Sequence, residues 1–471
     1  MATISSLGVG SGLDATSIIS QLMASERQPL TALNTKQSSY QSKLTAYGTV
    51  SNALSQFRDA LETLNSSQKL QPVTTMPADA TLLGATGGTG AVPGEYAVEV
   101  TQLAQAHRLA SAGQASSSSA IGNSTDSRTL TFDFGTVGGS FSGGKTVTIQ
   151  PGATLADMRD AINSANIGVS AAIVNDGSAT PYRLTLSSTQ TGAANSMKIA
   201  VSGEDYGDTA LSDLLNYDPA GSKNMSQTAA AQDAQLKVNG IAVTKTSNTV
   251  SDVVPGVTLT LKKTNTGSPT SLSVAYDTEA VTTAVKGFVD AYNKVDKSIK
   301  DISSYDASTK KAGTLYNDSA ARSIRGQMRG VVTSALSGGT GLTRLNQIGI
   351  EMQVDGKLKL NSDKLKTAMT TQFDKLPALF ATSSDGSKGF ATQLDELATA
   401  FLDDGGMLSS RTDGINSVLK KLDSDKLRLE SRLSIVQKQY EKQFAALDTA
   451  MSKMNSTASY LTQQLASLAN M

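Results

Sequence analysis

The chain has 471 residues, no cysteine, no tryptophan and one histidine, and its 41 lysine and arginine residues balance 41 aspartate and glutamate residues. The lack of cysteine excludes disulfides, thiolate metal sites and cysteine nucleophiles. A net charge of zero provides no field that would attract phosphate, so no nucleic-acid partner is expected. There is no run of about 18 apolar residues, so membrane insertion is not expected. The first residues have neither the basic nor the apolar region of a secretory signal peptide.

The first predicted element is a long helix that follows Leu30. Apolar residues recur there at steps of three, four and seven, which places them on one helical face. These residues are Leu33, Tyr40, Leu44, Tyr47, Val50, Leu54, Phe57, Leu61 and Leu64. Pro29 suits the first turn, which needs no amide donor, and Pro72 and Pro77 end the helical region.

Short alternating runs typical of β domains fill the middle of the chain. They cover residues 96–100, 129–134, 146–150, 183–186, 236–238, 257–261 and 272–275. One helix is predicted at 154–162, and the low-complexity tracts 84–90 and 116–119 are interpreted as loops or hinges.

Helical spacing returns at 281–299 and 324–331, and residues 350–360 predict a β-hairpin. Gly356 suits the left-handed third position of a three-residue loop. That loop pairs Met352 with Leu358 and Ile350 with Leu360, so that the four apolar side chains share one face.

The longest apolar stripe runs from Ile415 to Leu468, with no glycine or proline in residues 415–471. Most of its steps alternate between three and four, which indicates a heptad seam and favours a coiled coil over a single amphipathic core helix. Two successive steps of four, from Val436 through Tyr440 to Phe444, form a stutter.

These elements predict a multidomain α+β protein in which both termini form a helical leg and β-rich heads are inserted between them. The expected parts are a mobile N-terminal segment (1–42), a leg domain (43–75 with 278–439, including the hairpin near 348–360), an inner β head (76–110 with 226–277), an outer β head (111–225) and a mobile C-terminal coiled-coil segment (440–471).

No motif predicts catalysis, a metal site or a cofactor site, and we expect no enzymatic activity. Residues 139–146 match the phosphate-binding pattern G-x-x-x-x-G-K-[ST], but that chemistry needs a helix at the lysine, and 146–150 alternate like a strand. Residues 216–221 faintly resemble a calcium loop, with Gln227 where a bidentate glutamate would be required. His107 lacks a G-x-S-x-G partner, and we interpret it as a surface or hydrogen-bonded residue.

Five segments resemble the flagellar filament cap proteins, the hook-associated protein 2 family. They are residues 4–14 (ISSLGVGSGLD), 26–30 (ERQPL), 98–104 (VEVTQLA), 155–163 (LADMRDAIN) and 454–465 (MNSTASYLTQQL). The resemblance implies a structural cap that promotes flagellin folding and polymerisation at the filament tip and prevents flagellin leakage.

The resemblance also implies an extracellular location at the flagellum tip, reached without a cleaved signal peptide. Its implied partners are further copies of the chain in a ring, with a pentamer as the expected size, flagellin, hook-filament junction proteins, and an export chaperone at the C-terminal helix. Two alternatives stay open: a tip adhesin that binds surfaces or host glycans, and another component of the hook-filament junction.

Apolar residues near both termini are the candidate partner-binding residues, because a monomer would leave them exposed. We expect residues 1–42 and 440–471 to become ordered only against partners. The candidates are Ile4, Leu7, Val9, Leu13, Tyr440, Phe444, Leu447, Met451, Met454, Tyr460, Leu461, Leu465 and Leu468.

Overall fold

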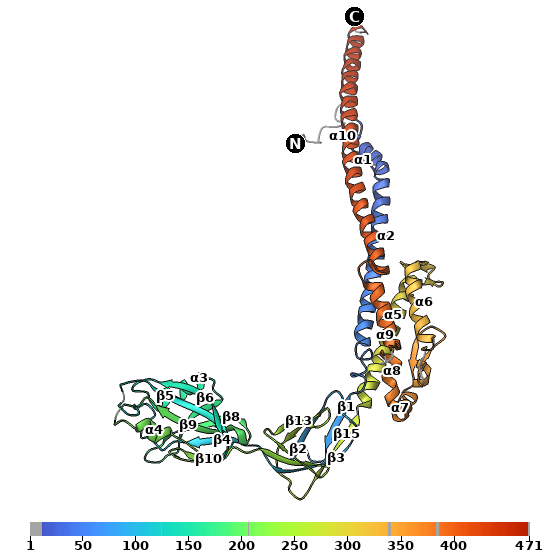
Figure 1. The fold of residues 1–471 in the computed structure, drawn as a ribbon. Coiled ribbons are helices and arrows are strands. Elements are labelled where there is room, and N and C mark those ends of the chain that lie inside the picture. The colour runs from blue at the N-terminus through green and yellow to red at the C-terminus, as the bar shows by residue number, and fades with distance from the viewer. Residues whose placement is uncertain (1–11, 124, 206, 338–340, 383–385, 470–471) are drawn as a thin grey trace. The chain divides into compact units, whose positions relative to one another are not determined.

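A computed structural model describes residues 12–469 apart from 124, 206, 338–340 and 383–385. The chain forms two compact units. The helical unit combines both ends of the chain, residues 1–70 and 282–471, and the β unit is the continuous segment 71–281. The predicted α+β class, with helical termini around a β-rich middle, is therefore confirmed (Figure 1).

The two ends of the chain supply three helices of the helical unit: α1 (Ala15–Glu26), α2 (Gln28–Leu61) and α10 (Met407–Ala469). Asp14 caps α1 by accepting a hydrogen bond from the Ser17 amide, and Pro29 lies in the first turn of α2 as predicted. Helices α2 and α10 lie side by side, and the Gln37 amide donates to Asp423 over 2.6 Å (Figure 1). Val50, Leu54, Phe57 and Leu61, on the stripe predicted for α2, are buried.

Five further helices complete this unit: α5 (Thr278–Ser303), α6 (Ser319–Thr333), α7 (Ser362–Thr371), α8 (Leu376–Phe380) and α9 (Phe390–Leu402). Short 3-10 turns η3 (Leu345–Ile348) and η4 (Phe373–Lys375) and the two-residue strands β16 (Tyr305–Asp306) and β17 (Lys311–Ala312) connect them. Phe288 of α5 lies at the centre of the core, with ring centroids 5.9 Å from Phe57 and 6.3 Å from Phe380.

The predicted hairpin is formed by β18 (Ile350–Met352) and β19 (Leu358–Leu360) in the expected register. Gly356 has a φ of +90°, as the three-residue loop requires. Arg325 and Arg329 of α6 pair with the buried Asp296, and Arg329 also donates to the carbonyl of Asp355, so the loop is held against α6.

The β unit contains two separate apolar cores. The first lies between a five-stranded sheet, in the order β1-β15-β3-β11-β12, and a three-stranded sheet, β13-β14-β2. The bounds are β1 (Val73–Pro77), β2 (Leu83–Gly87), β3 (Gly94–Gln102), β11 (Ala234–Val238), β12 (Ile241–Lys245), β13 (Thr249–Val254), β14 (Val257–Leu261) and β15 (Thr270–Tyr276). Successive side chains of β14 point to opposite faces of its sheet, so Val257, Leu259 and Leu261 are buried in this core while Thr260 faces solvent.

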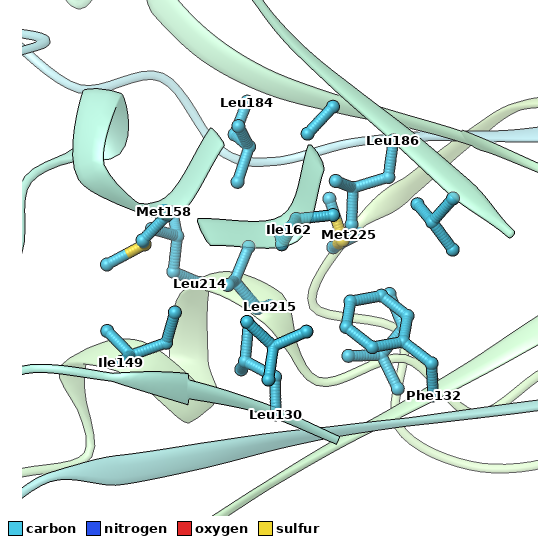
Figure 2. Close-up of a cluster of buried hydrophobic side chains, with 14 of the residues drawn as sticks. Leu130, Phe132, Ile149, Met158, Ile162, Leu184, Leu186, Leu214, Leu215 and Met225 are labelled. Atoms are coloured by element: carbon cyan, nitrogen blue, oxygen red, sulfur yellow. The ribbon is translucent and has the colours of Figure 1, made fainter. Parts of the chain in front are cut away.

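The second core is shared by the sheets β10-β4-β8-β7 and β6-β5-β9 and by two helices. The bounds are β4 (Ala106–Ala110), β5 (Arg128–Gly135), β6 (Phe141–Ile149), α3 (Leu155–Ser164), β7 (Val169–Asn175), β8 (Tyr182–Thr191), η2 (Ala193–Asn195), β9 (Ser196–Ser202), α4 (Ala210–Leu215) and β10 (Ser226–Ala229). Figure 2 shows Met158 and Ile162 of α3 among Leu130 and Phe132 of β5 and Leu184 of β8.

One sequence prediction is wrong in part. Residues 84–90 were expected to form a loop, but residues 84–87 belong to β2. The buried Leu83 pairs with Leu261, and a Cβ on Gly87 would collide with Val73. The glycines in this tract therefore allow close packing in a sheet, which composition alone does not distinguish from a turn.

Candidate functional site

A groove between α1 and α10 begins the candidate interaction surface. Ile19 and Met23 of α1 and Leu433 of α10 are buried against one another. Half-buried apolar side chains extend this cluster along the helices: Leu30, Leu429, Val436, Tyr440 and Phe444. Ile19 and Met23 are the only large buried side chains of α1, and the groove lies open beside them. Arg27, Gln437 and Glu441 also line it.

Neither α1 nor this groove was predicted from the sequence. The predicted helical stripe begins at Leu33, although Ile19 and Met23 lie four residues apart, after the helix-capping Asp14. That spacing was the available signal.

The predicted partner-binding residues divide into two groups along α10. Tyr440 and Phe444 pack against the α1 cluster, and Met451 is half-buried. The other side chains face solvent, with exposed fractions of 44 % for Leu447, 67 % for Met454, 61 % for Tyr460, 55 % for Leu461 and 66 % for Leu465.

Five further predicted residues lie near the ends of the chain. Leu13, two residues before the start of α1, is 41 % exposed. Ile4, Leu7 and Val9 lie outside the described residues, as does the side chain of Leu468.

The terminal part of α10 is uncharged and carries large exposed apolar side chains. Residues 455–469 contain no lysine, arginine, aspartate or glutamate, but they carry Tyr460, Leu461 and Leu465 on an exposed helix. Covering each large apolar side chain would contribute about 1.5 to 3 kcal/mol before the cost of ordering. This surface is therefore suited to an apolar helical partner rather than to a charged one.

The phosphate-binding match does not form a phosphate site. Its lysine and threonine lie within β6, as the alternation at 146–150 predicted, so no helix N-terminus faces the loop. Lys145 instead donates to the carbonyl of Ile167 over 3.2 Å.

His107 is fully buried and hydrogen-bonded. Its Nδ1 accepts from the Met197 amide over 2.9 Å, and its Nε2 faces the Gln227 Oε1 at 3.4 Å. The Tyr217 hydroxyl donates to the same oxygen over 2.8 Å. Burial lowers the pKa of His107, which keeps the imidazole neutral.

The residues of the calcium-like loop are also engaged within the protein. Asp218 pairs with Lys198 over 2.7 Å, and Asn216 accepts from the Val201 amide over 2.8 Å. Across the described part of the chain, no group of three histidine, aspartate or glutamate side chains is arranged to hold a metal ion. In the same residues, the helices that are long enough to span a bilayer are too polar to do so.

Family comparisons match three segments of the chain. Residues 11–107 match the family described as flagellar hook-associated protein 2 N-terminus, and residues 231–456 match flagellar hook-associated protein 2 C-terminus. Residues 129–190, which include α3, match the flagellin hook IN motif.

Individual relatives agree with these matches. The chain is 37 % identical over 484 residues to flagellar hook-associated protein 2 of Escherichia coli K12, covering 100 % of both chains. It is 34 % identical to the protein of the same name from Salmonella typhimurium LT2, covering 99 % of both. The solved D1-D2-D3 domains of the flagellar cap protein FliD from E. coli are 33 % identical, with a TM-score of 0.69, over 79 % of this chain and 99 % of that one. The chain therefore belongs to the flagellar hook-associated protein 2 family.

Proposed function

We propose that this chain is a subunit of the cap at the distal tip of the bacterial flagellar filament, outside the cell. The proposal is carried by the full-length similarity to relatives named flagellar hook-associated protein 2, together with the solved flagellar cap protein that shares this fold. None of these findings favours a tip adhesin or another hook-filament junction component, the two alternatives that the sequence left open.

In this proposal the cap is a ring of identical chains, with five as the expected number, that promotes flagellin folding and polymerisation and limits its leakage. The exposed apolar residues of terminal α10, with Tyr440 and Phe444 beside the α1 groove, contact flagellin or the hook-filament junction. An export chaperone covers the same helix before secretion. The high exposure of Leu461 and Leu465 supports this assignment, because such side chains gain most from a partner.

A double substitution at the end of α10 tests the proposal. Leu461→Gln with Leu465→Gln keeps good helix formers but removes the apolar surface. In a strain that lacks the native gene, we expect this variant to shift flagellin from attached filament to free monomer in the medium, by at least fivefold relative to the wild-type chain. Leu427→Gln is the matched control, because Leu427 is 67 % exposed on α10 but lies outside the terminal segment.

The amount of the chain itself in the medium is measured in parallel, to separate failed export from failed capping. Normal filaments with little free flagellin in the double variant would contradict the assignment of these residues. Normal filaments in the deletion strain would contradict capping as a whole.

A further inference from the structure

Strand β12 presents an unpaired edge of the five-stranded sheet. It pairs with β11 through five successive residues and without a bulge. The two-residue turn Asn239–Gly240 has φ values of +49° and +82°, as in a type I′ hairpin, so Val238 and Ile241 form the hydrogen-bonded closing pair. Ala242 and Thr244 consequently direct their amides and carbonyls away from the sheet.

Elsewhere in the β unit, asparagine side chains cover strand positions that have no neighbouring strand. Asn163 of α3 lies across β7, accepting from the Ala171 amide and donating to the Ala171 carbonyl. Asn265 accepts from the amide of Val100 on β3 and donates to the Val98 carbonyl. Among the described residues, no group bonds in this way to Ala242 or Thr244, and both residues are exposed. The β12 edge therefore keeps its capacity to pair with another strand.

The apolar face of the sheet also continues past β12. Ile241 and Val238 are cross-strand partners on one face, but Val238 is 7 % exposed and Ile241 is 70 % exposed. Val243, on the same face, packs partly against the core. An added strand would cover Ile241. The one charged residue of β12, Lys245, is paired with Asp252 over 2.5 Å.

We propose that β12 pairs antiparallel with β12 of a second copy of this chain, about a two-fold axis at Val243. The geometry favours a second copy because the outward groups are self-complementary. Ala242 of each copy lies opposite Thr244 of the other, which yields four backbone hydrogen bonds. Val243 meets its own counterpart, and Ile241 lies beside the aliphatic stem of Lys245, so no like charges are opposed.

This contact goes beyond the proposed ring and is independent of it. A two-fold contact uses the same surface on both copies, whereas a ring contact joins two different surfaces. One five-residue edge is far smaller than the roughly 1,000 Å² of a stable interface, so association is weak and depends on concentration.

Single cysteines test the register, since the natural chain has none. In the proposed register the two copies of residue 243 form a non-hydrogen-bonded pair, with Cα atoms about 4.5 Å apart, which suits a disulfide. Under mild oxidation of the full-length protein, we expect Val243→Cys to form covalent dimers at least tenfold faster than Thr244→Cys. Thr244 is also exposed, but in the proposed register it lies opposite Ala242 of the second copy. Two cysteines at position 244 would therefore not face each other.

A second substitution tests whether the outward backbone amide of residue 244 takes part in the contact. Thr244→Pro removes an outward amide while leaving the bonds to β11, and in the Val243→Cys background it is expected to reduce cross-linking to the rate of the control. Thermal unfolding confirms that each variant is folded. Equal rates for the two single cysteines, or cross-linking that survives Thr244→Pro, would overturn the proposal. Hydrogen-exchange protection of Ala242 and Thr244 that appears only when flagellin is added would assign this edge to a different chain and overturn it too.

Discussion

In this protein, single asparagine side chains form the two backbone hydrogen bonds that a neighbouring strand would otherwise provide. The side-chain amide of Asn293 in α5 accepts from the Leu358 amide over 2.7 Å and donates to the Leu358 carbonyl over 2.8 Å. Asn248 forms the same pair of bonds with Ala104. An asparagine amide carries one donor and one acceptor side by side, so it can replace a neighbouring strand where the ladder ends. These contacts satisfy backbone groups that would otherwise destabilise the fold.

His107 makes the stability of the β unit depend on pH. The unprotonated Nδ1 of His107 accepts a hydrogen bond from the Met197 amide. Protonation would place an N–H at Nδ1 against that amide N–H. Because the pKa in the folded chain is lowered, the unfolded chain binds more protons below about pH 6.5, and stability present above that pH is lost as the pH falls.

We therefore expect the free energy of unfolding of segment 71–281 to decrease between about pH 7.5 and 5.5. In His107→Gln, whose side-chain carbonyl can accept from Met197, this decrease should be smaller. Urea unfolding at the two pH values measures both proteins. An equal decrease in wild type and variant would show that other groups cause the pH dependence.

At the scale of elements, the long helices contain glycines that packing does not require. Gly48 lies within α2, and a Cβ added there would meet no atom within 4 Å. Glycine in a helix interior costs roughly 0.5 to 1 kcal/mol relative to alanine. We expect Gly48→Ala to raise the free energy of unfolding of the helical unit by that amount, as measured by urea unfolding.

Gly356→Ala is the opposite case. At its φ of +90° a side chain is strained, and the added Cβ would collide with Arg329. We expect a loss of about 1 to 3 kcal/mol. A stabilising effect of Gly356→Ala would mean that the hairpin loop can move away from α6.

At the scale of the whole molecule, the β unit is built to fold alone. It is one continuous segment with two cores of its own. Its ends meet, since the Asp277 amide donates to the Pro72 carbonyl over 2.8 Å. The helical unit, in contrast, needs both ends of the chain.

An excised fragment of residues 71–281 should therefore unfold cooperatively. Its thermal midpoint should lie within a few degrees of the corresponding transition in the full chain, as measured by calorimetry. Segment 282–471 alone, which lacks α1 and α2, is the control and should lack a cooperative transition. A disordered 71–281 fragment would show that the helical unit is needed to complete its core.

Features that depend on local periodicity could be predicted from the sequence. These are the long terminal helices, most of the β runs and the hairpin register at 350–360, because side-chain period and turn chemistry are encoded by neighbouring residues. The family was indicated separately, by the resemblance of five segments. Tertiary structure decided the rest. Whether Gly84 lies in a loop or a strand, whether His107 is buried, where α1 meets α10 and which strand edge stays open all depend on residues far apart in sequence. Pairing between distant segments leaves no periodic signal in either of them, so only the folded chain reveals the α1 groove and the β12 edge.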